Sequence, residues 1–128
     1  MATTEQRPAK TVLIVEDEDA IRTLLATLLR QHGYVVLTAQ HGREALDVLA
    51  SAPPPDLILL DTLMPVMDGW QFLERLQAGR HRSVPVVVIT GGVLGREWAA
   101  AHGCAGFLRK PFDAEELLAE VRRCLPPG

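Results

Sequence analysis

The chain has 128 residues, of which 48% are hydrophobic and 23% are charged, and its formal net charge at pH 7 is −3. This composition is typical of one globular domain and excludes a disordered chain. The weak negative charge gives no electrostatic reason for direct binding to nucleic acid or an anionic membrane. No apolar run approaches membrane-spanning length and no amino-terminal segment resembles a signal peptide, so we expect a cytoplasmic protein.

Strand and helix patterns alternate along the chain. Residues 1–9 are polar and carry no pattern, so we expect a disordered tail, one domain over residues 10–125, and a tail or the start of a linker at residues 126–128. Apolar runs without polar alternation are typical of strands buried on both faces. Such runs predict strands over Lys10–Val15, Tyr34–Ala39, residues 56 to about 64, Val84–Thr90 and Ala105–Arg109.

Between these strands, apolar residues recur at helical spacing. They predict helices from Asp19 to Gly33, over Gly42–Ser51, from Gly69 to about Gly79, over a short stretch from Arg96 to His102, and after the capping residue Asp113. Alternating strands and helices predict a three-layer α/β sandwich with a parallel five-stranded sheet. In the flavodoxin-like strand order 2-1-3-4-5, the carboxyl ends of the first and third strands flank the ligand crevice.

Polar residues end the predicted strands at that same edge of the sheet. They are Glu16, Asp17, Asp61, Thr90 and Lys110. Three clustered carboxylates repel one another unless a cation lies among them, and oxygen ligands suit Mg²⁺. An ammonium and a hydroxyl beside the metal suit a phosphoryl group, and a neighbouring carboxylate can be its nucleophile. Taken singly, each residue also has a structural explanation, since aspartate is a common turn residue.

Four motifs at these strand ends resemble the receiver domains of response regulators in two-component signalling. They are Leu13–Glu18, Leu60–Gly69, Ile89–Gly91 and Gly106–Phe112. The resemblance covers about residues 10 to 125, and the motifs follow one another in the order that the family has. It implies a flavodoxin-like (βα)5 fold with the strand order 2-1-3-4-5, as in chemotaxis regulators.

The resemblance also implies roles for the residues at the strand ends. Asp61 would accept a phosphoryl group from a sensor histidine kinase, a phosphotransfer protein or a small phosphodonor. Glu16 and Asp17 would hold Mg²⁺ together with Asp61 and the carbonyl group of Leu63. The chain would therefore be no enzyme beyond catalysing its own phosphorylation and dephosphorylation.

Three further positions match the parts of the family that respond to phosphorylation. Lys110 would pair with the phosphoryl group, and the hydroxyl of Thr90 would close on it. Phe107 occupies the position of the aromatic switch residue, which turns inward when Thr90 moves. The expected result is a change in binding to a downstream protein target.

Other functions stay open at this stage. A phosphatase with a phosphoaspartate intermediate would carry a second aspartate where this chain has Leu63. A receiver-like interaction module could work without phosphorylation, and the chain could be the receiver fragment of a longer DNA-binding regulator. The glycine-rich segment Gly91–Gly95 and the short helix after it put a standard activation dimer in doubt, so the sequence leaves the oligomeric state open.

The remaining chemically distinctive side chains are expected to be structural. Cys104 and Cys124 lie in no metal-binding motif, so we expect reduced, packed thiols. Trp70 and Trp98 are expected to pack or to lie at the surface. Surface positions are expected for the four histidines, His32, His41, His81 and His102.

Overall fold

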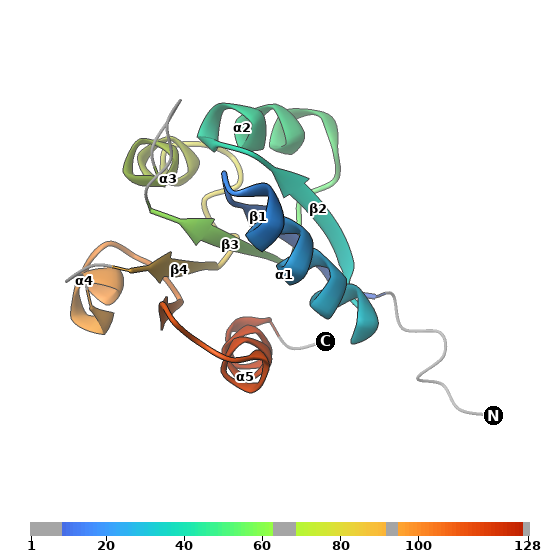
Figure 1. Ribbon diagram of the computed structural model, residues 1–128. Helices are drawn as coiled ribbons and strands as arrows, with labels where there is room; N and C mark the ends of the chain where they lie inside the picture. The colour runs from blue at the N-terminus through green and yellow to red at the C-terminus, as the bar shows by residue number, and fades with distance from the viewer. Residues whose placement is uncertain (1–8, 63–68, 92–94, 127–128) are drawn as a thin grey trace.

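Five parallel strands form the predicted sheet in the described part of the computed structural model, which comprises residues 9–62, 69–91 and 95–126 (Figure 1). The strands are β1 (Thr11–Val15), β2 (Val35–Ala39), β3 (Leu57–Asp61), β4 (Val86–Thr90) and β5 (Gly106–Arg109). Their order across the sheet is β2-β1-β3-β4-β5, and each neighbouring pair is parallel. The flavodoxin-like fold and its strand order are thereby confirmed.

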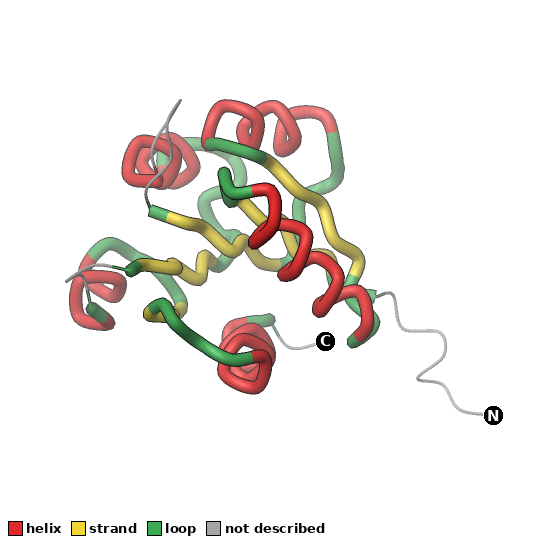
Figure 2. Tube along the Cα trace, in the orientation of Figure 1, coloured by secondary structure: helices red, strands yellow, loops and turns green. Residues whose placement is uncertain are grey.

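Helices cover both faces of this sheet (Figure 2). They are α1 (Asp19–Gln31), α2 (Gly42–Ser51), α3 (Gly69–Gln77), α4 (Arg96–Ala101) and α5 (Ala114–Cys124). Leu25 of α1 and Leu117 of α5 share one apolar core cluster, on one face of the sheet. Leu49 of α2 and Phe72 of α3 belong to a second cluster, on the other face. The strands are buried between these two layers, which explains their lack of polar alternation.

The strands are shorter than the apolar runs. We expected the third strand to continue to about residue 64, but β3 ends at Asp61, which is the last residue paired with β4. Residues 63–68, which hold the predicted strand end, lie outside the described residues. At β4 the cause is clear, because Pro85 has no N–H to donate to the ladder and the strand begins at Val86.

Local sequence signals fix the helix ends. After α1, Gly33 adopts a φ of +88°, a left-handed conformation that favours glycine. At the start of α5, the side chain of Asp113 accepts a hydrogen bond from the N–H of Glu116, whose own side chain accepts one from the N–H of Asp113. This capping box satisfies two backbone groups that the helix leaves unpaired.

Three of the four histidines are half-buried, so the expectation of four surface histidines is wrong. His41 is the N-cap of α2, where its ring accepts a hydrogen bond of 3.2 Å from the N–H of Glu44. The ring of His81 lies 3.1 Å from the carbonyl oxygen of Leu49 and so ties the turn before β4 to α2.

The third half-buried histidine, His102, lies beside both tryptophans at the end of α4. Its ring centroid is 4.4 Å from that of Trp70 on α3 and 4.4 Å from that of Trp98 on α4. The two indole centroids are 5.6 Å apart. These three rings, in tilted and edge-to-face contact, hold the six-residue α4 against α3, which confirms a packing role for the tryptophans.

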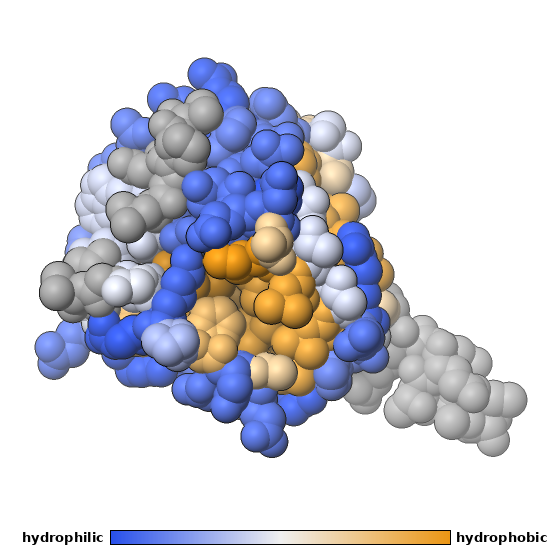
Figure 3. Space-filling model, viewed as in Figure 1, coloured by the Kyte–Doolittle hydropathy of each residue, from blue (hydrophilic) through white to orange (hydrophobic). Residues whose placement is uncertain are grey.

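An apolar groove runs between α1 and α5, where Figure 3 shows hydrophobic residues gathered on the visible face. Leu24 is its most exposed large apolar residue, and Leu28 and Phe112 also line it. In the part of the chain that the structure describes, no helix has the length and hydropathy needed to cross a membrane.

Candidate functional site

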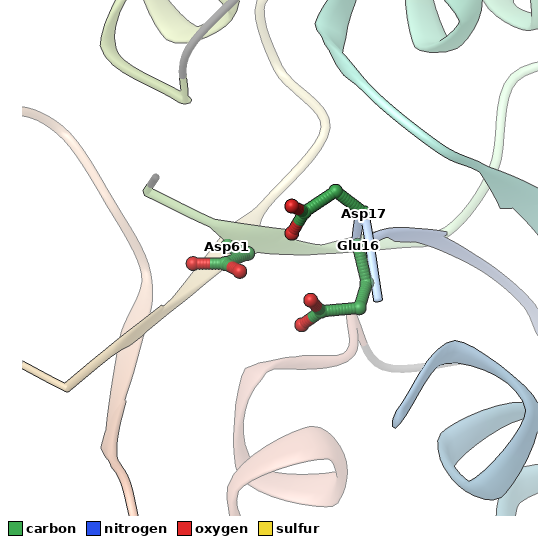
Figure 4. Close-up of side chains that lie close together, drawn as sticks. All are labelled: Glu16, Asp17 and Asp61. Atoms are coloured by element: carbon green, nitrogen blue, oxygen red, sulfur yellow. The ribbon is translucent and has the colours of Figure 1, made fainter. Parts of the chain in front are cut away.

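Three carboxylates meet at the carboxyl edge of the sheet (Figure 4). Glu16 and Asp17 directly follow β1, and Asp61 is the last residue of the neighbouring strand β3. One oxygen from each of the three side chains lies within 4.8 Å of the others. Because β1 and β3 are parallel neighbours, their carboxyl ends bring Asp61 together with Asp17 and Glu16, which lie 44 and 45 positions before it in the chain.

The carboxylate of Glu16 is buried without full compensation. Its residue is 1% exposed, and Oε1 accepts no hydrogen bond from any described residue, while Oε2 accepts a bond of 3.2 Å from the N–H of Glu18. Burial, and then the negative charge of Asp61, raise the pKa of Glu16 from its ordinary 4.5 to about 7. A buried oxygen without a donor, among other carboxylate oxygens, fits a hard divalent cation such as Mg²⁺.

Lys110, the residue directly after β5, places a positive charge beside these carboxylates. Its Nζ lies 3.6 Å from Oδ2 of Asp61 and 4.0 Å from Oε1 of Glu16. Its backbone N–H donates a hydrogen bond of 2.8 Å to the carbonyl oxygen of Thr90, and its peptide bond to Pro111 is cis. The ammonium is thus held beside Asp61 and opposite the acidic pair.

Thr90 completes the set of strand ends. It is buried at the end of β4, one residue beyond Ile89, which pairs with Asp61. Thr90 therefore lies at the same edge of the sheet as Asp61 and Lys110. Leu63, whose carbonyl group we expected at the metal, lies outside the described residues.

Comparison with known proteins agrees with this geometry. The model of the response regulator receiver domain family matches residues 12–122. The chain belongs to this family. Its acidic pocket is consistent with aspartate phosphorylation and Mg²⁺ binding, as the function of a receiver domain requires.

Individual relatives show how much of the chain is shared. Response regulator MprA of Mycolicibacterium vanbaalenii is 40% identical over 116 residues, which are 89% of this chain and 49% of that protein. Chemotaxis protein CheY4 of Vibrio cholerae has a TM-score of 0.84 at 34% identity, covering 92% of this chain and 100% of that chain. The chain spans about half the length of the curated relatives it matches.

A third comparison concerns the metal. The receiver domain of sensor histidine kinase PA1611 from Pseudomonas aeruginosa PAO1 has a TM-score of 0.81 at 30% identity, covering 91% of this chain and 98% of that chain. Its structure was described with a magnesium ion coordinated in the active site cleft.

The expected switch residue of this receiver, Phe107, is buried in β5. The guanidinium carbons of Arg96 and Arg109 lie 5.7 Å and 5.2 Å from the centroid of its ring. Its backbone N–H donates a hydrogen bond of 2.8 Å to the carboxylate of Glu120 on α5. The ring is therefore largely buried and flanked by the guanidinium groups of Arg96 and Arg109.

Sequence reasoning missed Glu120. Its carboxylate also accepts hydrogen bonds from Arg123, at 2.8 Å and 3.1 Å, and from Arg96 at 3.3 Å. The hydrogen bonds from Arg123, with further help from the N–H of Phe107, lower the pKa of Glu120 from 4.5 to about 2. A signal was present, because Glu120 lies three residues after Leu117 and so borders the apolar stripe of α5.

Sequence reasoning also missed Arg22, which contacts the loop of the acidic pair. The available signal was its spacing three residues after Asp19, at which opposite charges meet on a helix.

Proposed function

We propose that this receiver accepts a phosphoryl group on Asp61 with the help of Mg²⁺, and that the phosphorylated form binds its protein partners differently. One observation carries the proposal: the three clustered carboxylates have the ammonium of Lys110 at 3.6 Å from Asp61. Neither a turn nor a helix end requires that combination. The magnesium ion described in the PA1611 receiver supports the same ion here.

The ligands of the ion would be the carboxylates of Glu16, Asp17 and Asp61, with the carbonyl group of Leu63 as an expected fourth. When bound, Mg²⁺ would neutralise charge on the phosphoryl oxygens during transfer. Oε1 of Glu16 supports this ligand set, because this buried oxygen accepts no hydrogen bond from the described residues and the ammonium of Lys110 stays 4.0 Å away.

Transfer would begin with attack by a carboxylate oxygen of Asp61 on the phosphorus of a phosphohistidine. A P–O bond forms as the P–N bond breaks, the electron pair returns to the imidazole, and the product is an acyl phosphate. The ammonium of Lys110 and the hydroxyl of Thr90 would donate hydrogen bonds to the phosphoryl oxygens. Later attack by water would return Asp61 to a carboxylate, so the chain would act as an enzyme only on itself.

The partners would be a sensor histidine kinase or a phosphotransfer protein upstream, and a protein target downstream. Phe107 would transmit the change in Thr90 to the face formed by β5 and α4. We assign the receiver to residues 10–125 and place its action in the cytoplasm, where two-component signalling transfers phosphoryl groups.

A second proposal follows from the length of the relatives. Because the chain spans about half the length of the curated relatives it matches, we propose that the receiver is one part of a longer regulator. Relatives named as probable transcriptional regulators support a DNA-binding output in that longer protein, and not in the receiver itself.

Acetyl phosphate tests the proposal directly. We expect one added phosphoryl group by intact mass spectrometry, in the presence of Mg²⁺ and not in its absence. The adduct should be lost in Asp61→Asn. It should persist in Asp56→Asn, which is the matched control. Asp56 directly precedes the first residue of β3, away from the carboxylate cluster, and accepts a hydrogen bond from the N–H of Thr11.

The alternative has its own signature in the same experiment. A folded protein that binds Mg²⁺ but gains no phosphoryl group would contradict the proposal and favour an interaction module that works without phosphorylation.

A further inference from the structure

One arginine side chain binds the loop that carries the acidic pair. Nη1 of Arg22, in the first turn of α1, donates hydrogen bonds to the carbonyl oxygens of Glu16, at 2.9 Å, and of Asp17, at 3.4 Å. Nη2 forms an ion pair with the carboxylate of Asp19. The Arg22 side chain is only 14% exposed, so the guanidinium is enclosed by the segment that it binds.

The loop needs this support because it lies between two regular elements. The β1 strand ends at Val15, and the N–H of Glu16 still donates to the carbonyl oxygen of Ala39 at 3.0 Å. Beyond that point, the N-cap residue Glu18 adds no side-chain capping bond to α1. The contacts of Arg22 to two successive carbonyl groups therefore fix the backbone from which both acidic side chains extend.

The position of this backbone decides where the two carboxylates lie. Mg²⁺ requires near-ideal octahedral geometry at about 2.1 Å, so a small displacement of a ligand weakens binding strongly. Groups that orient metal ligands without touching the metal often change its affinity. A guanidinium that holds Glu16 and Asp17 in place should therefore strengthen metal binding.

The charge of Arg22 acts in the opposite direction. A cation close to the site repels Mg²⁺, so the removal of the charge alone should tighten metal binding. The positional and the electrostatic effects thus differ in sign, and one substitution distinguishes them.

We propose that Arg22 is a positioning residue for the metal site: it holds the loop between β1 and α1 so that Glu16 and Asp17 present their carboxylates together with Asp61. The proposal rests on the proposed function, because it assumes that Mg²⁺ binds these carboxylates. Arg22 itself touches neither the metal nor the phosphoryl group.

The test is the affinity of the whole chain for Mg²⁺ alone, measured by titration calorimetry without a phosphodonor. We expect Arg22→Met to bind Mg²⁺ about tenfold more weakly than the wild type. Arg22→Lys keeps the charge, but its compact ammonium cannot span two carbonyl groups and a carboxylate. It should therefore recover only part of the affinity.

Arg30→Met is the matched control. Arg30 lies in the last turn of the same helix, and its Nη2 donates to the carbonyl oxygen of Val36 at 3.3 Å. Its replacement removes one positive charge and a hydrogen bond to a carbonyl group, as Arg22→Met does. Because Arg30 lies at the opposite end of α1 from the acidic loop, the affinity for Mg²⁺ should not change.

Asp19→Asn is a second variant that should not disturb the fold, since the Asp19 side chain is 84% exposed. It releases one of the three anchors of Arg22 and should weaken Mg²⁺ binding by a smaller factor. Thermal unfolding of the metal-free variants shows whether each is folded.

The outcomes separate the two proposals. Unchanged or tighter Mg²⁺ binding in Arg22→Met, beside normal binding in the wild type, overturns the positioning role and leaves the proposed function intact. If Arg22→Met does not fold, unchanged affinity in both Arg22→Lys and Asp19→Asn overturns it instead. A wild-type chain that binds no Mg²⁺ overturns both proposals.

Discussion

Glu16 and Glu120 are both buried glutamates, 1% and 8% exposed, yet their surroundings shift their pKa values in opposite directions. Glu16 lies among other carboxylates, and burial raises its pKa to about 7. Glu120 accepts hydrogen bonds from Arg123 and from the N–H of Phe107, and its pKa falls to about 2. Burial alone therefore does not decide how a carboxylate behaves.

The opposite pKa shifts distinguish a residue of a functional site, Glu16, from a residue with a structural role, Glu120. Glu120 is satisfied within the protein, so it stabilises the packing of α5 on β5. Glu16 has a buried oxygen that accepts no hydrogen bond from the described residues. Leaving this oxygen unsatisfied destabilises the fold, and functional sites retain such groups because a bound ligand offsets the destabilisation.

The pH dependence of stability should show the largest effect. The folded pKa of Glu16, about 7, lies above its unfolded value of 4.5, so protonation of Glu16 favours the folded state. This contribution is complete below about pH 4.5 and is lost as the pH rises through about 7. At 1.36 kcal/mol per pKa unit, the loss amounts to at most about 3 kcal/mol.

Urea unfolding of the metal-free protein between about pH 5 and pH 8 measures this loss. Glu16→Gln should flatten the profile, because the variant lacks the carboxyl group whose pKa is raised. Saturating Mg²⁺ should also flatten it, because the ion stabilises the ionised carboxylates. Parallel profiles for the wild type and Glu16→Gln would show that Glu16 behaves like any exposed glutamate, and the contrast with Glu120 would disappear.

Glu120→Ala should have the next largest effect. The N–H of Phe107 would lose its acceptor inside the protein, which costs about 2 kcal/mol of unfolding free energy near neutral pH. The folded pKa of Glu120 is depressed, so its contribution is present above about pH 4.5 and is lost as the pH falls towards 2. The variant should therefore be less sensitive to acid than the wild type.

Glu115→Ala is the control for this substitution, because Glu115 is an exposed glutamate in the first turn of the same helix. It should change stability by only a few tenths of a kcal/mol. If urea unfolding shows equal losses of unfolding free energy in Glu120→Ala and Glu115→Ala, the buried hydrogen bonds of Glu120 do not stabilise the fold.

Arg96→Ala should have the smallest effect. Its side chain is 62% exposed and its ion pair with Glu120 measures 3.3 Å, so solvent screens the interaction. We expect a loss below about 1 kcal/mol in urea unfolding, and less than that of Arg123→Ala, whose contact with Glu120 measures 2.8 Å. A larger loss in Arg96→Ala would assign the stabilisation of Glu120 to α4 rather than to its own helix.

Much of the fold and part of the candidate site could be predicted from the sequence. The apolar runs predicted all five strands, because strands buried on both faces lose polar alternation. The polar residues that end these runs pointed to Glu16, Asp17, Asp61 and Lys110, which the structure brings to one edge. Errors concerned strand ends, such as Val84 and Pro85 before β4, where ladder pairing and not local composition decides.

By itself, the sequence determined which side chains stand at the ends of the strands, because that depends only on neighbours in the chain. Only the tertiary structure decided which buried side-chain atoms form hydrogen bonds or ion pairs. Glu120 is satisfied because α5 packs on β5 within reach of Phe107, and Oε1 of Glu16 is not, because its nearest described cation, Lys110, stays 4.0 Å away. Such partnerships depend on distances between elements far apart in sequence, which no local pattern encodes.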